Sequence, residues 1–425
     1  MRAALREARV PILVAVLMRA ALALGSGATA NRFPDGPDYV HIAVTLATQG
    51  RYPEEFYFAR PPLYPLLLTP WGVGGPVAVV IGAKLLNLFL GAATTVLAFR
   101  FLRHRGEEPA RWAAWSVALH PTLLVASTWV ATEVLYATLL LAALLALARL
   151  EESPRLSRGV ASGILLGLCV LTRPQALMLV PGLLLVAAIW LLRRVPWRIR
   201  VRCVAASALA AAITIAPWTA RNWFRHGEFL LVSDGGGLMF VIANSDWGFR
   251  YQQVASPGEY RSLERELLGQ EIPSRLAATS RFGPATRDRV LFRAGFEWIR
   301  RHPTEFVVTT LRRLRHFCAP WVSSSAYSAR LAMLSACWFA PLFLFGFAGL
   351  VSALSRREGG AALVGTVAAI TILTVGALFH SVQRYRIPSI DLYLGLFGAA
   401  WLAERSGRLR RVGGSVPRLG LFPGP

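Results

Sequence analysis

Long apolar segments recur along the whole chain, and they constrain its fold more than any other feature. A helix crosses roughly 30 Å of membrane hydrocarbon with about 17 to 25 apolar residues, and about ten segments approach that length. They lie near residues 10–28, 76–99, 112–128, 131–148, 159–173, 175–192, 203–219, 330–354, 361–380 and 387–403. Of the 425 residues, 55% are hydrophobic and only 16% are charged, a balance that is rare in soluble domains. The sequence therefore predicts an all-α polytopic membrane protein.

Basic residues are distributed unevenly between the connections of these segments. The formal net charge of +23 would suit a nucleic-acid-binding protein, but the arginines gather in alternate loops. They are Arg2, Arg6 and Arg9; Arg100, Arg103, Arg105 and Arg111; Arg149, Arg155 and Arg158; Arg193, Arg194, Arg198, Arg200 and Arg202; Arg356 and Arg357; and Arg405, Arg408, Arg410 and Arg411. Short cytoplasmic loops carry such an excess of arginine. We therefore expect the lipid bilayer, and not nucleic acid, as the partner, with both termini cytoplasmic.

The remaining connections are then extracytoplasmic, and they divide the chain into three regions. Loops 29–75, 174, 220–329 and 381–386 are predicted to lie outside. The Arg-rich loop 220–329 does not contradict this, because long loops are translocated largely regardless of charge. The regions are an N-terminal membrane module (1–219) with the first external loop (29–75), an extracytoplasmic loop (220–329), and C-terminal membrane helices with a basic tail (330–425).

The long external loop contains two patterns of its own. Short apolar runs on both sides of the glycines at 235–237 are typical of a β-hairpin that ends at A-N-S, residues 243–245. Residues 303–317 alternate apolar and basic side chains with a helical period, which favours an interfacial amphipathic helix over a membrane span. A further interfacial helix is predicted in the first external loop.

The first thirty residues and the cysteines complete the outline. A basic start followed by an apolar run resembles a secretory signal, but Arg19 interrupts the run and a retained first helix fits the polytopic chain better. The cysteines are Cys169, Cys203, Cys318 and Cys337. They have no C-x-x-C or Cys/His spacing, so neither a disulfide framework nor a zinc site is predicted.

Two carboxylates in the first external loop are the main candidates for catalysis. Asp35 and Asp38 lie where a membrane protein meets water, and a carboxylate there can accept a proton from a hydroxyl group. Arg60 follows in the same loop, and its guanidinium group offers a rigid fork of donors that suits a phosphate. Glu133 begins an apolar segment on the same predicted side. It is either a third functional acid or a glutamate that interacts favourably with the helix dipole.

Four further arginines lie at the outer ends of apolar segments: Arg173, Arg221, Arg384 and Arg386. One interpretation is that their side chains simply reach from the apolar region to the interface. The other follows from the charge rule, because short outer loops are normally poor in arginine. The segments L-T-R-P and Q-R-Y-R-I-P depart from that rule and indicate an anion-binding site.

A series of short motifs occurs along the chain: D-G-P-D-Y followed by A-R-P-P-L-Y-P in the first external loop, H-P-T-L-L-V-A-S-T-W-V-A-T-E at 120–133, L-T-R-P at 171–174, A-P-W-T-A-R-N at 216–222, and R-Y-R-I-P-S at 384–389. Together these motifs resemble those of the GT-C glycosyltransferases. Similarity is greatest to the bacterial family 39 type, which is related to protein O-mannosyltransferases and to the aminoarabinose transferases that modify lipid A. These motifs follow one another in the expected order over almost the whole chain.

The resemblance implies a site. Asp35 would be the catalytic base with Asp38 as a neighbouring acid, and Arg60 would bind the donor phosphate. The pattern of charges at the predicted outer ends adds Glu133 as a third candidate acid and Arg173, Arg221, Arg384 and Arg386 as further phosphate-binding candidates. The substrate pocket is expected to include Tyr39, Tyr64, Asn222 and Tyr385. Gly36 stands where many relatives have a second acid, and Ala59 where the aminoarabinose transferases have a glutamate. These departures argue against a bound metal, and no cofactor is expected.

The resemblance and the physical pattern lead to one hypothesis. The chain is expected to be a bacterial inner (plasma) membrane enzyme with an extracytoplasmic active site, which transfers a sugar from a polyprenyl phosphate donor with inversion. The acceptor would be an extracytoplasmic protein, lipid or glycan. Asp35 would deprotonate the acceptor hydroxyl while arginines stabilise the leaving phosphate. Two alternatives stay open: a transporter or flippase of a lipid-linked saccharide, and a glycan polymerase or ligase that uses a diphosphate-linked donor.

Overall fold

The computed structural model describes residues 6–31, 33–53, 60–254, 256–321, 329–379 and 383–413. All regular secondary structure in these ranges is helical, which confirms the predicted all-α class. Ala59, residues 381 and 382, and the tail from residue 414 lie outside the described residues.

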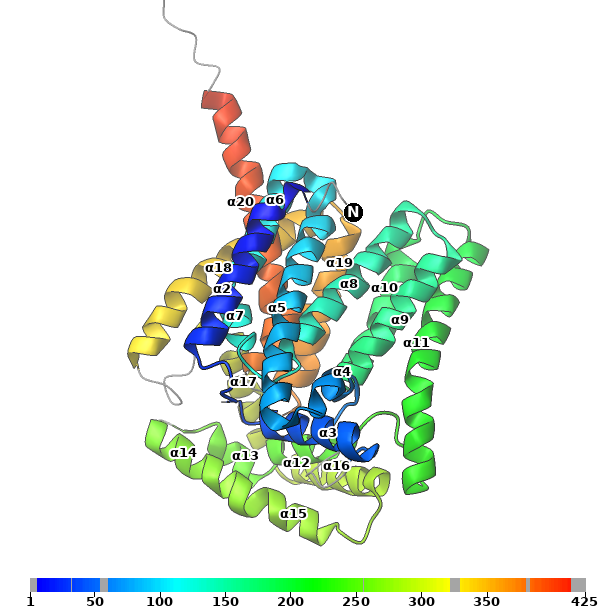
Figure 1. Cartoon of the computed structure of the whole chain (residues 1–425), viewed down its shortest axis with the longest axis vertical. Helices are drawn as coiled ribbons and strands as arrows, with labels where there is room; N and C mark the ends of the chain where they lie inside the picture. The colour runs from blue at the N-terminus through cyan, green and yellow to red at the C-terminus, as the bar shows by residue number, and fades with distance from the viewer. Residues whose placement is uncertain are drawn as a thin grey trace, which may run out of the picture.

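The helices follow one another with short connections (Figure 1). They are α2 (Arg9–Gly25), α3 (Gly36–Gln49), α4 (Leu63–Gly72), α5 (Gly75–Leu102), α6 (Glu107–Ala118), α7 (Pro121–Ala126), α8 (Glu133–Glu152), α9 (Leu156–Thr172), α10 (Ala176–Val186), α11 (Trp197–His226), α12 (Gly236–Ala243), α13 (Asp246–Tyr251), α14 (Pro257–Glu266), α15 (Ile272–Ala278), α16 (Pro284–Arg301), α17 (Pro303–Cys318), α18 (Ala329–Ser355), α19 (Gly359–Thr371) and α20 (Leu392–Gly413). Shorter turns include the 3-10 helix η5 (Gln383–Arg386) and the π-helix η6 (Ile387–Asp391).

Every predicted apolar segment falls on a helix, although not every segment is one helix. By length and composition, five helices of the described chain can cross a membrane: Gly75–Arg105, Glu133–Glu152, Trp197–His226, Ala329–Ser355 and Gly359–Gly376. Two apolar helices are shorter, Leu156–Thr172 and Ala176–Leu191. The segment predicted at 112–128 is divided between α6 and α7, because Pro121 begins a new helix after an extended His120. The predicted number of about ten crossings stays a prediction.

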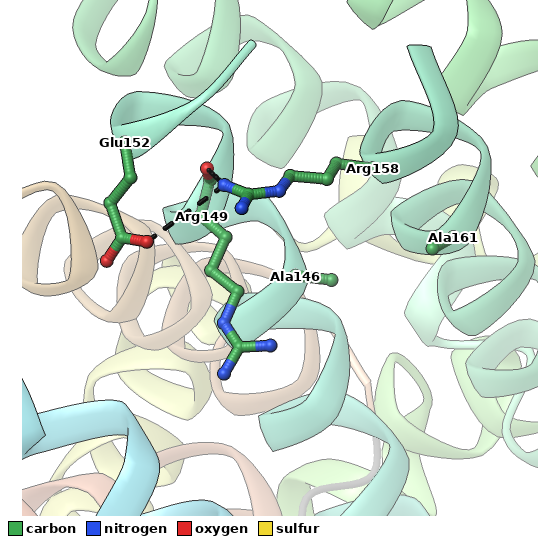
Figure 2. A pocket seen from close by; sticks show the side chains of 5 residues that line it. All are labelled: Ala146, Arg149, Glu152, Arg158 and Ala161. Atoms are coloured by element: carbon green, nitrogen blue, oxygen red, sulfur yellow. Dashed lines mark hydrogen bonds and ion pairs between the residues drawn. The ribbon is translucent and has the colours of Figure 1, made fainter. Parts of the chain in front are cut away.

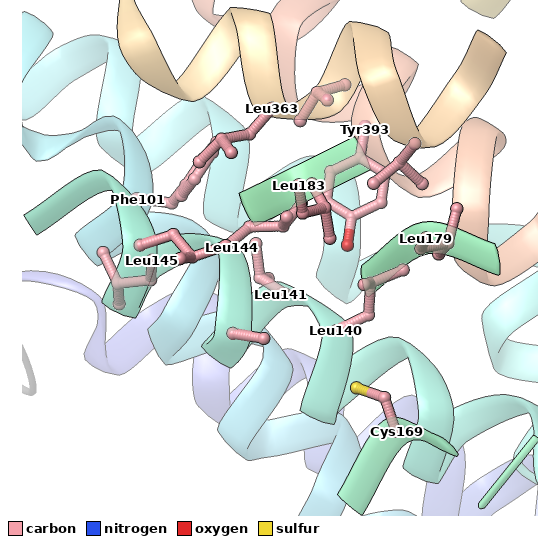
Figure 3. Packing of buried hydrophobic residues seen from close by; sticks show 14 of the residues in the cluster. Phe101, Leu140, Leu141, Leu144, Leu145, Cys169, Leu179, Leu183, Leu363 and Tyr393 are labelled. Carbon is pink, nitrogen blue, oxygen red and sulfur yellow. The ribbon is translucent and has the colours of Figure 1, made fainter. Parts of the chain in front are cut away.

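Helix α8 lies at the centre of the bundle. Its leucines pack against side chains of α5, α9, α10, α19 and α20, and Figure 3 shows Leu140, Leu144 and Leu183 at this junction. On its outer side α9 approaches α11 closely, since a Cβ atom on Gly163 would lie 2.1 Å from the carbonyl oxygen of Ser207. Small residues at such positions let two helix backbones meet in the absence of a hydrophobic driving force.

The two ends of the bundle differ in what they contain. Helices α3 and α4 and the region α12–α17 gather at one end, whereas α6 and the far part of α20 mark the other (Figure 1). The loops predicted to be extracytoplasmic therefore share one end. At the opposite end Arg105 pairs with Glu358 at 2.6 Å and with Glu404 at 3.7 Å, which ties α19 and α20 to the end of α5.

The predicted β-hairpin within 220–329 is wrong. The glycine-rich stretch instead begins α12, and it is preceded by an irregular segment that passes along α11. Asn222 donates to the carbonyl oxygens of Leu230 and Val232, and Trp218 donates to that of Val232 at 2.9 Å. These side chains satisfy the carbonyl groups that a hairpin would pair with a second strand.

The predicted helix at 303–317 is confirmed as α17, but Arg313 does not lie on its solvated side. Arg313 is buried and donates to the carbonyl oxygen of Ala243 at 3.2 Å and to Oδ1 of Asn244 at 3.1 Å. The helix is thereby joined to the end of α12. Burial of the guanidinium group lowers the pKa of Arg313 to about 10.

The buried carboxyl group of Asp288, on α16, makes the stability of the protein depend on pH. Burial raises its pKa to about 7, although its Oδ1 accepts a hydrogen bond from Gly237 N at 2.6 Å. Since the pKa in the folded state lies above its ordinary value of 3.8, the stabilisation is complete below that value and is lost as the pH rises to about 7. We expect Asp288→Asn, which keeps the accepting oxygen, to raise the thermal midpoint more at pH 8 than at pH 5.

Thermal unfolding of the purified protein in detergent at both pH values measures this difference. Glu297→Gln, which removes an exposed carboxylate from the same helix, is the matched control. An equal dependence on pH in Asp288→Asn and in the parent protein would show that Asp288 does not titrate in this range.

Candidate active site

Asp35 immediately precedes α3, yet it does not act as an ordinary helix cap. An aspartate at this position normally accepts a hydrogen bond from a backbone N–H of the first turn. Asp35 makes no such bond, although Pro37 and Asp38 begin the helix in the usual way. Its two carboxylate oxygens instead contact Arg60 and Arg384.

Arg60 lies between the two acids of the first external loop. Its Nη2 is 3.2 Å from Oδ1 of Asp35 and 2.6 Å from Oδ2 of Asp38, and its Nε donates to the same Asp38 oxygen at 2.9 Å. The Tyr52 hydroxyl donates to the Arg60 carbonyl oxygen at 2.8 Å and so helps to position this residue. Asp38 therefore binds Arg60 more closely than Asp35 does.

The second oxygen of Asp35 is bound by an arginine from far along the chain. Arg384, in η5, donates from Nη2 to Oδ2 of Asp35 at 2.9 Å. Its Nη1 lies 4.0 Å from Oε1 of Glu133, at the start of α8. Glu133 is in turn paired with Arg173, whose Nη2 is 2.5 Å from the same oxygen.

These contacts form one continuous series of alternating charges, which we call the ion chain: Asp38, Arg60, Asp35, Arg384, Glu133 and Arg173. It joins the first external loop, the start of α8, the end of α9 and η5. Glu133 is the most deeply buried member, with 1% of its side chain exposed, and a buried carboxylate must be paired. The three acids and three arginines balance in charge.

Arg173 is held where α9 ends. Its backbone is extended, as expected for a residue before a proline, and its Nε donates to the Thr132 hydroxyl at 2.8 Å. The guanidinium group lies over the rings of Tyr136 and Tyr385, at 5.7 and 5.4 Å from their centroids. Its Nη1 is buried without a hydrogen-bond acceptor in the described part of the chain, so it can donate to a bound anion.

Aromatic rings line the ion chain. Arg384 lies over Phe33 and Tyr385, with centroid distances of 4.8 and 5.2 Å, and Arg60 lies 5.7 Å from the centroid of Tyr39. Tyr39 packs edge to face against Tyr64, whose hydroxyl accepts from Ala131 N at 3.1 Å. The rings reduce the contact of these guanidinium groups with water, which strengthens the charge interactions between them.

The charges of the ion chain keep Asp35 ionised. Burial raises the pKa of Asp35, but the positive charges of Arg384 and Arg60 together outweigh it and leave the pKa below its usual value. Burial opposes the charge of Arg384, yet nearby Tyr385, Glu133 and Asp35 leave its pKa raised. For Tyr39, burial raises the pKa to about 12. In this state Asp35 is a carboxylate held by two arginines.

The structure does not bring all the predicted residues together. Arg386 is buried away from the ion chain, where its Nε is 2.7 Å from Oδ1 of Asp391 and its Nη1 donates to the carbonyl oxygens of Phe317 and Ala319. Asn222 fastens the 230–232 segment to α11, as described above. The prediction that both bind substrate receives no support from this geometry.

Arg221 lies beside the site rather than within the ion chain. Its guanidinium group is 5.4 Å from the ring centroid of Tyr52 and 4.8 Å from that of Trp218. Since Tyr52 also binds the backbone of Arg60, Arg221 is separated from the ion chain by one ring. Sequence reasoning missed Tyr52, Thr132 and Tyr136. The first two adjoin the motifs of Arg60 and Glu133 in the sequence, and Tyr136 is one helical turn after Glu133.

The carboxylates of the site are directed towards guanidinium groups and not towards a shared centre. In the described residues, no group of three or more His, Cys, Asp or Glu side chains is placed to hold a metal ion. Asp35, Asp38 and Glu133 each contact an arginine instead. The arrangement can hold an anion wherever that anion replaces a carboxylate as the partner of an arginine.

Several known proteins are similar to this chain. Residues 78–220 match the family model of dolichyl-phosphate-mannose-protein mannosyltransferases. No curated protein sequence matches the chain. Among solved structures, the apo oligosaccharyltransferase of Archaeoglobus fulgidus aligns over 97% of this chain and 51% of its own, with a TM-score of 0.60 and 15% identity. The same organism's AglB, in complex with an inhibitory peptide and a dolichol-phosphate, aligns over 98% and 52%, with a TM-score of 0.59 and 14% identity.

ArnT from Cupriavidus metallidurans, bound to undecaprenyl phosphate, aligns over 96% of this chain and 79% of its own, with a TM-score of 0.43 and 14% identity. The chain shares its fold with the oligosaccharyltransferase and spans about half of that protein's length. The GT-C resemblance found in the sequence is confirmed at the level of the fold.

Proposed function

We propose that this chain is an integral membrane glycosyltransferase that moves a sugar from a polyprenyl phosphate donor to an extracytoplasmic acceptor, with inversion. The observation that carries this proposal is the ion chain, which places a carboxylate between two arginines at the end of a helical bundle. A lipid-linked sugar has its tail in the bilayer and its reacting carbon at the interface, so its chemistry belongs at such an end. The family model that matches residues 78–220 is that of dolichyl-phosphate-mannose-protein mannosyltransferases, and AglB was solved in complex with a dolichol-phosphate.

The proposed reaction needs a base for the acceptor hydroxyl and positive charge for the leaving phosphate, and the ion chain contains both. Asp35 would accept the proton of the acceptor hydroxyl as its oxygen bonds to the anomeric carbon. On the opposite face of that carbon, the bond to the phosphate oxygen breaks and its electron pair leaves with the phosphate. Arg384 and Arg173 would stabilise the charge that develops there. The configuration of the anomeric carbon inverts because attack and departure occur on opposite faces.

The pairing within the ion chain also implies how the donor binds. Arg384 donates to Asp35 from Nη2, and its Nη1 lies 4.0 Å from Glu133. A donor phosphate that binds Arg384 therefore competes with Asp35 for the same guanidinium group. When the Arg384 guanidinium group moves from Asp35 to the phosphate, Asp35 loses one of the positive charges that lower its pKa. Donor binding therefore makes Asp35 a stronger base.

The charge balance favours a monophosphate-linked donor over the alternatives. A phosphodiester carries one negative charge, equal to that of the Asp35 carboxylate that it would replace at Arg384, whereas a diphosphate carries two. We expect Arg60→Lys to weaken binding of a polyprenyl monophosphate by a few-fold, because lysine keeps the charge but loses the fork that bridges Asp35 and Asp38. Native mass spectrometry of the purified protein with polyprenyl monophosphate and diphosphate measures this.

Arg51→Lys is the matched control, because Arg51 is an exposed arginine of the same loop that contacts Gln49. Tighter binding of the diphosphate than of the monophosphate would favour the ligase alternative. Equal binding by Arg60→Lys and the parent protein would leave Arg60 as a structural partner of the two aspartates.

The proposed orientation makes a separate prediction. In a background with the exposed Cys318 and Cys337 replaced by Ser, a cysteine at Asp246 should react with an impermeant thiol reagent added to intact cells. Cysteines at Glu107 and Ser355, at the opposite end of the bundle, should react only after the membrane is opened. Labelling of Glu107→Cys in intact cells would reverse the orientation.

A further inference from the structure

A second charged hollow lies at the end of the bundle opposite the ion chain. It is lined by Ala146, Arg149 and Glu152 of α8 and by Arg158 and Ala161 of α9, and its volume is about 340 Å³ (Figure 2). Glu133 and Glu152 are the two ends of α8, and a helix of that length spans roughly 30 Å. The hollow is therefore at the other membrane interface from the candidate active site.

The shape of the hollow follows from its side chains. Ala146 and Ala161 have only a methyl group each, so the two helices leave room between them at this level. Arg158 reaches across from α9, where its Nη1 donates to the Arg149 carbonyl oxygen at 2.5 Å and lies 4.0 Å from the Glu152 carboxylate. Figure 2 shows this side chain closing one side of the hollow.

The charge of the hollow is positive and incompletely neutralised. The Arg149 side chain turns away from Glu152, and in the part of the chain that the structure describes its guanidinium group has no hydrogen-bond acceptor. Arg100, near the end of α5, adds a third positive charge that acts on Arg149. Glu152 is the single acid in the lining, and its side chain is 68% exposed, so its pairing with Arg158 is weak.

An apolar stripe on α9 meets the hollow at one of its ends. Leu156, Val160 and Ile164 are exposed and recur every fourth residue, which places them in one stripe along the helix. Ile164 also follows Ala161 by three residues, so it lies on the same face as the lining, whereas Leu156 lies on nearly the opposite side of α9 from Arg158. A ligand that suits both features has an anionic head for the arginines and a chain for the stripe.

We propose that this hollow binds the phosphate headgroup of an anionic phospholipid in the leaflet opposite the active site. The Arg149 and Arg158 guanidinium groups donate to the phosphate oxygens, and an acyl chain passes Ile164 towards the middle of the bundle. Basic pockets between membrane helices recognise lipid headgroups in this way. A free phosphate would share the polar contacts but would gain nothing from the apolar stripe.

Native mass spectrometry of the full-length protein, titrated with dioleoyl phosphatidylglycerol, tests this site. We expect the double variant Arg149→Gln and Arg158→Gln to bind this lipid roughly tenfold more weakly than the parent protein, since two charge-assisted contacts are lost. Arg155→Gln is the matched control, because it removes one positive charge near Arg158 from a residue that does not line the hollow. This variant should bind the lipid as tightly as the parent protein. Glu152→Gln removes the competing carboxylate and should bind the lipid more tightly.

Three results would overturn the proposal. First, an equal loss of affinity in Arg155→Gln would indicate attraction to general surface charge. Second, unchanged affinity in the double variant, with no gain in Glu152→Gln, would show that the lipid does not bind in the hollow. Binding of dioleoyl phosphatidylcholine as tightly as of phosphatidylglycerol, with inorganic phosphate displacing both, would show a site for free phosphate rather than for an anionic lipid. Because Glu152→Gln is expected to gain affinity, misfolding cannot imitate the predicted result.

Discussion

Asp35→Asn is expected to reduce the rate of sugar transfer by about 10³-fold while the protein remains folded, because an amide cannot accept the acceptor's proton. The substitution nearly preserves the volume of the side chain, and its Oδ1 can still accept from Arg60 or Arg384. The loss should appear in kcat as well as in kcat/KM, since a base acts in the transition state and not in donor binding. Transfer by purified protein, reconstituted with its lipid-linked donor, measures both constants.

The same variant has a second expected property that a merely structural role would not produce. Asp35 competes with the donor phosphate for Arg384, whose Nη2 is 2.9 Å from Oδ2 of Asp35. Asp35→Asn should therefore bind a polyprenyl monophosphate at least as tightly as the parent protein. Asp38→Asn is the matched control, because Asp38 contacts Arg60 alone among the arginines of the ion chain, and its effect on transfer should be milder. Equal rates for the two variants would remove Asp35 from the role of base.

Arg384→Lys is expected to lower kcat/KM by about 100-fold, a loss similar to that of one donor from an oxyanion-binding site. Arg384 uses two ends of its guanidinium group, one directed at Asp35 and the other at Glu133. A lysine ammonium is a compact charge that cannot occupy both positions. The KM for the donor should rise more than the KM for the acceptor, and the yield of folded protein should be unchanged.

Arg51→Lys again provides the control, since it makes the same exchange at an exposed arginine that contacts Gln49. A residue that only extends to the membrane interface would tolerate lysine, because its stem and charge are kept. Kinetics of Arg384→Lys that equal those of the parent would support that interpretation and leave the phosphate site unassigned.

Much of the site could be predicted from the sequence because its residues depart from local rules. Asp35 and Arg60 share one loop with turn-forming prolines, and Arg173 and Arg384 are arginines in short loops that the charge pattern predicts to be outer. Their departures from the charge rule pointed to an anion. What the sequence could not provide was the order of contacts, because Asp35 and Arg384 are brought together only by the packing of α8 with η6 and the helices around them.

The differences between expectation and structure have equally physical causes. Arg384 and Arg386 lie in one 3-10 turn, where residues two apart project in different directions, so only the first contacts Asp35. Arg386 is instead required to neutralise the buried Asp391, an acid that periodicity alone does not reveal. The predicted hairpin failed because Asn222 and Trp218, which belong to α11, bind the carbonyl groups at 230–232. Tertiary contacts overrode the local β-pattern there.

The central claim, transfer from a monophosphate-linked polyprenyl donor, is tested most directly by the lipids of the cell. Lipid and glycan extracts are compared by mass spectrometry from cells that lack the gene and from cells that carry either the parent gene or Asp35→Asn. The parent should restore one glycan or glycolipid species, whereas Asp35→Asn should not restore it and should accumulate a polyprenyl monophosphate sugar. Accumulation of a diphosphate-linked saccharide instead, or identical extracts from all three strains, would contradict the account.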